Sequence, residues 1–201
     1  MNFMQLRREF PVTERFCYVD HAGVSPISRA AAEAGRRFLD DVQQHGDVHS
    51  EAWEQRADAV RRSFAQWIGG REDGVAFVKN TTQGLLIVAS GMPWRCGDNV
   101  VISNVEFPAN VYPWLNLARR GVETRMVPMR DWRIHIDDVR AAMDGRTRVL
   151  SLSHVEFANG FRNDLAALGD LCRSRGVFFC MDAIQSLGVM PLDLRDTPVD
   201  F

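Results

Sequence analysis

The stretch VFFCMDAIQSLG, residues 177–188, decides the fold class of this chain. Four apolar residues and a cysteine lead into Asp182, a pattern that predicts a buried β-strand with an acid at its end. The residues before it, Asp164 to Arg175, predict a helix that stops at Gly176. A helix followed by a short apolar strand is typical of a parallel sheet that is covered on both faces.

The same alternation of strands and helices runs back to about residue 75. Strands are predicted over residues 75–78, 100–103, 124–127, 148–153 and 177–181. Helices are predicted over residues 26–44, 50–68, 85–90, 109–120, 136–145 and 164–175. We therefore expect an α/β fold, a mostly parallel sheet with helices on both faces. We expect an N-terminal segment with helices over residues 1–70 and the α/β domain over residues 71–201.

Composition narrows the class of partner. The 201 residues include 24 Lys and Arg against 26 Asp and Glu, a net charge of −2, which gives no general attraction to nucleic acid or to an anionic membrane. No segment approaches the ~20 apolar residues of a membrane span, and the N-terminus lacks the apolar core of a signal peptide. We expect a cytoplasmic protein with a small-molecule partner.

The cysteines and histidines predict no metal site. The four cysteines stand singly and are expected to be reduced thiols of the core: Cys17, Cys96, Cys172 and Cys180. Cys180 lies in a predicted buried strand, where an apolar setting raises a thiol pKa, so it is not expected to be a nucleophile. His45 and His49 have helical spacing, but Gly46 lies between them and no third ligand is evident, which favours a solvated face.

The loops after the predicted strands carry the candidate functional residues, because ligands of such sheets collect at the carboxyl ends of the strands. In Asn80 to Gly84, the start of a helix and the hydroxyls of Thr81 and Thr82 could bind a phosphate, or a threonine could simply cap the helix. Asp182 needs a positive partner, either an arginine or a cofactor nitrogen such as the pyridine nitrogen of pyridoxal phosphate.

Five segments, in this order, resemble the class V aminotransferases, the pyridoxal-phosphate fold-type I group that includes cysteine desulfurases, kynureninases and isopenicillin N epimerase-like proteins. They are YVDHAGVSP (18–26), KNTTQG (79–84), NVEFPANVYPW (104–114), SHVEFANGFRNDL (153–165) and MDAIQSLG (181–188). The resemblance covers nearly the whole chain. It implies the large domain of that fold, with pyridoxal 5'-phosphate as the cofactor and a homodimer when full length.

The resemblance also implies roles for single residues. Thr81 and Thr82 match the pair that binds the cofactor phosphate. Asp182 matches the catalytic acid at the pyridine nitrogen, and Gln185 the group that bonds the phenolic oxygen. Ile184 falls where an apolar side chain covers one face of the ring.

Phe107 falls where desulfurases stack a histidine on the other face of the ring, because the Glu-His-His segment of those enzymes reads Glu106-Phe107-Pro108 here. This resembles the kynureninase and epimerase-like branch, so a cysteine desulfurase is the less expected enzyme. His21 lies in the loop that the family places near the substrate.

One expected group is missing. The family's Schiff-base lysine lies downstream of the acid, past Asp200-Phe201, and the only lysine here, Lys79, stands elsewhere. We therefore expect a truncated large domain, part of a class V enzyme that acts on a small amino acid by transamination, epimerisation or elimination. The alternative is a catalytically inactive truncated protein or pseudoenzyme of the same fold.

Overall fold

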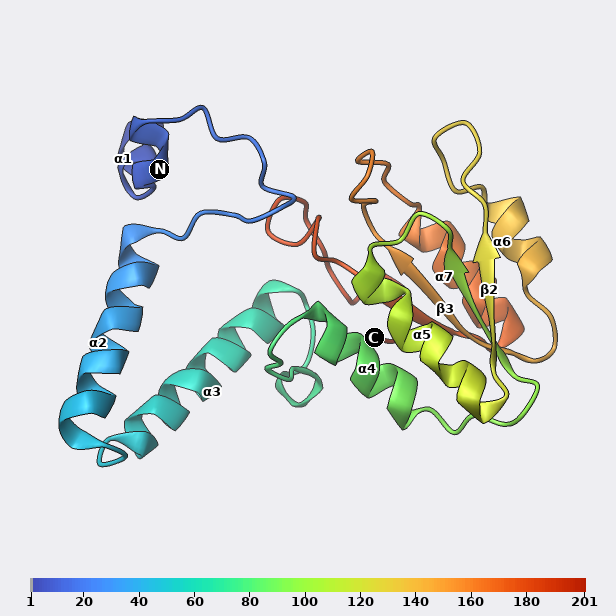
Figure 1. The fold of residues 1–201 in the computed structure, drawn as a ribbon, viewed down its shortest axis with the longest axis horizontal. Helices are drawn as coiled ribbons and strands as arrows, with labels where there is room; N and C mark the ends of the chain where they lie inside the picture. Colours follow the sequence, from blue (N-terminus) through green and yellow to red (C-terminus); the bar gives the residue numbers. More distant parts are fainter. Residues whose placement is uncertain (1) are drawn as a thin grey trace. The chain divides into compact units, whose positions relative to one another are not determined.

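The computed structural model describes residues 2–201, which divide into two compact units, one ending at Val60 and the other spanning Arg61–Phe201. Figure 1 traces the chain through both. Within the described part of the chain, no helix is long and apolar enough to cross a membrane.

The first unit consists of helices. Helix α1 (Phe3–Arg8) and a 3₁₀ turn (Pro11–Glu14) precede α2 (Arg29–His45), and α3 (Ser50–Trp67) follows and continues into the second unit. The expected helix over residues 26–44 is therefore confirmed with a later start. It starts late because Ser28 is the cap: its hydroxyl accepts a 3.2 Å hydrogen bond from the backbone N–H of Ala31.

The second unit contains one parallel sheet. Its strands are β1 (Asn99–Ser103), β2 (Glu123–Val127), β3 (Thr147–Ser153) and β4 (Phe178–Asp182), in the spatial order β2-β1-β3-β4. Every neighbouring pair is parallel, as the apolar strands predicted. Asp182 is the last residue of β4.

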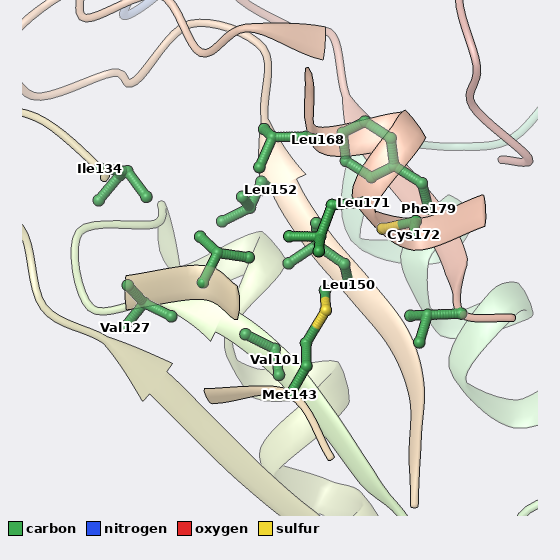
Figure 2. Close-up of a cluster of buried hydrophobic side chains, with 12 residues drawn as sticks. Val101, Val127, Ile134, Met143, Leu150, Leu152, Leu168, Leu171, Cys172 and Phe179 are labelled. Carbon is green, nitrogen blue, oxygen red and sulfur yellow. The ribbon is translucent and has the colours of Figure 1, made fainter. Parts of the chain in front are cut away.

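Helices cover both faces of this sheet (Figure 1). The helices are α4 (Thr81–Gly91), α5 (Tyr112–Leu115), α6 (Ile136–Ala142) and α7 (Leu165–Arg175), with 3₁₀ turns over Glu72–Gly74, Pro108–Asn110 and Asn116–Arg120. Alternate strand residues enter two separate cores. The core with α6 and α7 takes Val101, Leu150 and Phe179 from the strands (Figure 2), and the core with α4 and α5 takes Val100, Val149 and Cys180.

The expected strand over residues 75–78 is wrong, because this segment is not paired into the sheet. The carbonyl of Val75 instead accepts a 3.2 Å hydrogen bond from Nε of Arg61. Phe77 is 55% exposed, with the Arg61 guanidinium 5.2 Å from the centre of its ring. Apolar residues alone do not make a strand, since the ladder needs a neighbour.

The single helix expected over residues 109–120 is also wrong. The segment divides into a 3₁₀ turn, the one-turn helix α5 and a second 3₁₀ turn. Pro113 sits at the start of α5 and has no N–H to bond to a carbonyl of the preceding turn, so a continuous α-helix cannot run through it. The predicted stop at Gly121 is confirmed, with a φ of 74°.

Candidate functional site

The carboxyl ends of the parallel strands β1, β3 and β4 form one edge, from which the loops with most of the candidate residues leave. The last residues of β3 and β4, Ser153 and Asp182, are register partners. The carbonyl of Asp182 then accepts a 2.8 Å hydrogen bond from the N–H of His154. The sheet thus brings loops that are distant in the sequence to a common edge, as expected for a ligand site.

Asp182 is buried at this edge, with 5% of its surface exposed. Its Oδ1 accepts a 2.9 Å hydrogen bond from the N–H of Ile184, which turns the chain back over the acid. Burial raises the pKa of Asp182, and the Ile184 bond opposes that rise. In residues 2–201, no lysine, arginine or histidine forms an ion pair with this carboxyl, so the arginine partner considered from the sequence is absent there.

Glu106 lies beside Asp182 in a buried polar network. Its Oε1 accepts a 2.8 Å hydrogen bond from the N–H of Ser153, and its Oε2 accepts from the Ser153 hydroxyl at 2.6 Å. Asn110 Nδ2 adds a third bond to Oε2 at 2.9 Å. Burial raises the pKa of Glu106 against these bonds, and the charge of Asp182 raises it further.

Glu156, in the loop after β3, is the third buried acid, with 1% of its surface exposed. Its Oε1 accepts a 2.9 Å hydrogen bond from Asn163 Nδ2, whereas its Oε2 is buried with no hydrogen-bond partner in the described chain. Burial, followed by the charge of Glu106, raises its pKa to about 8. Glu156 is therefore mainly protonated at neutral pH.

His154 connects the β3 loop to the β4 loop. Its Nδ1 lies 2.9 Å from the hydroxyl of Ser186. Burial lowers the pKa of His154, and the charge of Arg162 lowers it further, so the ring is neutral at pH 7. Arg162 itself is exposed.

Apolar surface lies on the same loops. The rings of Phe107 and Phe157 meet edge to face with their centres 5.2 Å apart, and the two residues are 50% and 42% exposed. Ile184 is 63% exposed. Exposed aromatic and aliphatic side chains beside a buried acid are suited to contact the faces of a planar ligand.

Asn80 forms the start of α4. Its side chain accepts a 2.9 Å hydrogen bond from the N–H of Gln83, and the side chain of Gln83 accepts from the N–H of Lys79 at 2.6 Å. Asn80 is thus the cap, which corrects the alternative that Thr81 or Thr82 caps the helix. Thr81 and Thr82 are the first two residues of the helix, where backbone N–H groups lack intrahelical acceptors. The helix packs against the turn that follows Phe107.

The remaining candidates are less closely tied to this edge. Gln185 is half-buried in the turn after Ile184. His21 belongs to the first unit, where its exposed ring packs on Tyr18 with centres 5.4 Å apart. Its role towards a substrate stays a prediction.

Sequence reasoning missed Glu106 and Glu156 as members of the site. A glutamate in a loop is usually exposed, so neither attracted a role. The available signal was position, because each glutamate follows within three residues of a predicted buried strand.

The cysteines are free thiols, as expected, but only two of them are in the core. Cys172 and Cys180 are buried, and burial raises the pKa of each thiol to about 12, consistent with an inert Cys180. Cys17 and Cys96 are exposed, which corrects the expectation for those two.

The fold and this edge fit a pyridoxal-phosphate fold-type I domain, and a comparison with family models supports that class. The model for "Aminotransferase class-V" matches residues 17–201. The chain therefore belongs to the class-V aminotransferase family, which confirms the family and the fold predicted from the sequence.

Individual relatives carry a more specific name. A "Probable cysteine desulfurase" of Methanothermobacter thermautotrophicus is 30% identical over 207 residues, covering 100% of this chain and 52% of that protein. A "Cysteine desulfurase" of Klebsiella pneumoniae subsp. pneumoniae is 33% identical over 215 residues, covering 98% and 52%. These names overturn the expectation, based on Phe107, that a cysteine desulfurase is the less expected enzyme. The chain spans about half the length of the curated relatives it matches.

Solved structures support the fold. A C-DES mutant with glycine covalently linked to its PLP cofactor superposes with a TM-score of 0.90 at 24% identity, covering 96% of this chain and 53% of that one. The apo cysteine desulfurase of Thermococcus onnurineus NA1 has a TM-score of 0.86 at 23% identity, covering 100% and 52%. The cofactor predicted from the sequence is thus confirmed at the level of the family.

Proposed function

We propose that this chain is the cofactor-binding part of a class-V pyridoxal-phosphate enzyme that cleaves a carbon–sulfur bond in cysteine or cystine. The observation that carries the proposal is Asp182, a buried acid without a cationic partner in residues 2–201. A buried carboxylate is costly unless a cation meets it. A protonated pyridine nitrogen is the cation that this geometry would accept.

The residues around Asp182 fit the rest of the cofactor. Phe107 and Ile184 offer exposed apolar surface for the two faces of the ring. The start of α4 offers backbone N–H groups and the hydroxyls of Thr81 and Thr82 to a phosphate, with capping already provided by Asn80. Gln185 would donate to the phenolic oxygen, as the family resemblance implies.

Bound in this way, pyridoxal phosphate supplies an electron sink for a carbanion at the substrate Cα. Asp182 would hold the proton on the ring nitrogen, since a carboxylate beside a base stabilises its charged form. Glu106 would hold the Ser153 end of β3 in place through its three hydrogen bonds. Phe107 can stack on the ring but cannot carry a proton, so proton transfer on that face needs another group.

The relatives suggest the substrate. The two relatives described above match over nearly the whole chain and are named cysteine desulfurases, and one similar structure is titled as a complex of the cystine C–S lyase C-DES with cysteine persulfide. We therefore place the substrate among the sulfur-containing amino acids. The family resemblance adds a homodimer and a covalent lysine other than Lys79 to the proposal.

The test uses the natural gene product that contains these 201 residues. Wild type should develop pyridoxal-phosphate absorbance and release sulfide or persulfide from cysteine or cystine. Asp182→Asn should bind the cofactor more weakly and lose turnover, because the neutral amide does not favour the protonated ring. The matched control is Asp170→Asn on α7, whose side chain is 73% exposed and which should behave as wild type.

The outcomes separate the two parts of the proposal. Unchanged cofactor absorbance and turnover in Asp182→Asn would refute the role of the acid. Cofactor-dependent turnover of another amino acid, with no sulfur product from cysteine or cystine, would refute the substrate class and leave the cofactor assignment standing.

A further inference from the structure

Three metal-ligating side chains meet where α2 turns into α3, in the first unit. Nδ1 of His45 lies 3.0 Å from Oδ1 of Asp41, and Nδ1 of His49 lies 2.7 Å from the same oxygen. One ligand atom from each of these residues lies within 4.8 Å of the others. The structure thus supplies the third ligand, Asp41, that sequence reasoning did not find for the two histidines.

Local geometry explains the meeting. Asp41 and His45 are four residues apart on α2 and share one face of the helix. Gly46, with a φ of 63°, ends the helix and reverses the chain. His49 then opens α3, because its carbonyl accepts from the N–H groups of Ala52 and Trp53 at 3.0 and 3.3 Å. The backbone therefore brings all three side chains together at the turn between α2 and α3.

A further contact orients the carboxylate. Nε1 of Trp53 donates a 2.9 Å hydrogen bond to Oδ2 of Asp41, which leaves Oδ1 facing the two histidines. The ring of Phe38 packs edge to face on Trp53, with centres 5.1 Å apart. Outer hydrogen bonds of this kind fix metal ligands and are worth roughly 10–100-fold in metal affinity.

We propose that Asp41, His45 and His49 bind a divalent ion of the zinc class. With metal–ligand distances of about 2.0–2.1 Å, tetrahedral ligand atoms lie about 3.3 Å apart. The separations from Asp41 Oδ1 to the two Nδ1 atoms, 3.0 and 2.7 Å, are shorter than that value by about 0.3 and 0.6 Å, so the ligand atoms must move slightly apart to admit the ion. Two imidazoles and one carboxylate suit zinc and leave one position open to water.

The ligand set favours this class of ion over magnesium or calcium, which depend on several oxygen ligands, whereas affinity for zinc comes largely from the imidazole nitrogens. Arg37 and Arg56 line the same cavity as Asp41 and Trp53, and their positive charge opposes every divalent cation alike. The site belongs to the first unit and does not depend on the proposed function.

The test titrates the full chain, freed of metal, with zinc by calorimetry, and repeats the titration with cobalt by absorption spectroscopy. Wild type should bind one ion per chain, and the cobalt spectrum should show nitrogen and oxygen ligation without a thiolate charge-transfer band. His45→Gln, His49→Gln and Asp41→Asn should each lose at least 10-fold in affinity. Trp53→Phe should lose roughly 10-fold while keeping all three ligands.

Two controls exclude other sites. His135→Gln, a histidine of the second unit, should bind zinc as wild type does. Cys17→Ser/Cys96→Ser, which removes the exposed thiols, should also retain the site. Circular dichroism of every variant reports whether the helices persist. Absence of zinc binding in wild type, or equal affinity in folded His45→Gln and His49→Gln, would overturn the proposal.

Discussion

Ser153 donates two hydrogen bonds to Glu106, one from its backbone N–H at 2.8 Å and one from its hydroxyl at 2.6 Å. These bonds connect the loop after β1 to the last residue of β3. They hold a buried glutamate among the loops of the candidate site. Removal of its side chain would leave each of the donors around it without this acceptor.

Glu106→Ala should lower the free energy of unfolding by at least about 1–3 kcal/mol, because buried donors of Ser153 and Asn110 are left unpaired. Glu106→Gln should lower the free energy of unfolding by a smaller amount, because the NH₂ group of the glutamine must face one of these donors. Urea unfolding checks both, with Glu54→Ala at an exposed position as the control. Equal stability of Glu106→Ala and wild type would contradict the network.

Glu156 should make stability fall as pH rises. Its pKa is raised from 4.5 to about 8, so between these values the folded state holds a proton that the unfolded state has lost. The fall should reach at most about 1.4 kcal/mol per pH unit across this window and stop above it.

Glu156→Gln should flatten that fall, since glutamine mimics the protonated acid and does not titrate. Urea unfolding at pH 5, 6.5 and 8 on wild type and the variant isolates the contribution of this residue from those of Asp182 and His154. Parallel pH profiles of the two proteins would show that another group is responsible.

Variants of Asn80 and Thr81 should distinguish the stability of α4 from the binding of pyridoxal phosphate. Asn80→Ala removes the cap of α4 and should cost about 1 kcal/mol in unfolding free energy. Thr81→Ala removes no cap, so it should leave stability within about 0.5 kcal/mol of wild type. In the natural gene product, Thr81→Ala should nevertheless weaken pyridoxal-phosphate binding, measured by absorbance titration. A large loss of stability in Thr81→Ala would contradict this division of roles.

Phe107 and Phe157 should be energetically coupled. Their edge-to-face contact, at 5.2 Å between centres, predicts a coupling energy of about 0.5–1 kcal/mol. A double-mutant cycle with Phe107→Leu and Phe157→Leu measures it by urea unfolding. Strictly additive effects would mean that the rings do not stabilise each other.

The sequence predicted most of the sheet because its strands are continuous apolar runs between helices. It also placed Asp182 at a strand end, since one acid after an apolar run is a local signal. It failed at residues 75–78, where the pattern was correct but no strand within residues 2–201 pairs with the segment. Local patterns report the preference of a segment, and pairing depends on the rest of the fold.

The buried acids show a second limit. Burial of Glu106 and Glu156 depends on three strand ends meeting, which no local pattern contains. Asp41 is different, because the spacing of Asp41, His45 and His49 was visible as two successive intervals of four residues. The sequence predicts no metal site there, because Gly46 lies between the two histidines and no third ligand is evident, whereas in the structure the turn returns His49 to the side of Asp41 and His45.

The position of β1 in the middle of the sheet has a consequence for folding. Its partners β2 and β3 both come later in the chain, so β1 cannot be paired on both sides until Thr147–Ser153 has been synthesised. At ribosomal speeds of ~5–20 residues per second, that leaves this apolar strand incompletely paired for roughly 2.5–10 seconds. Parallel pairing between distant segments is also slow in itself. We therefore expect the nascent chain to be most prone to aggregation, and most dependent on chaperones, in the interval between the synthesis of β1 and of β3.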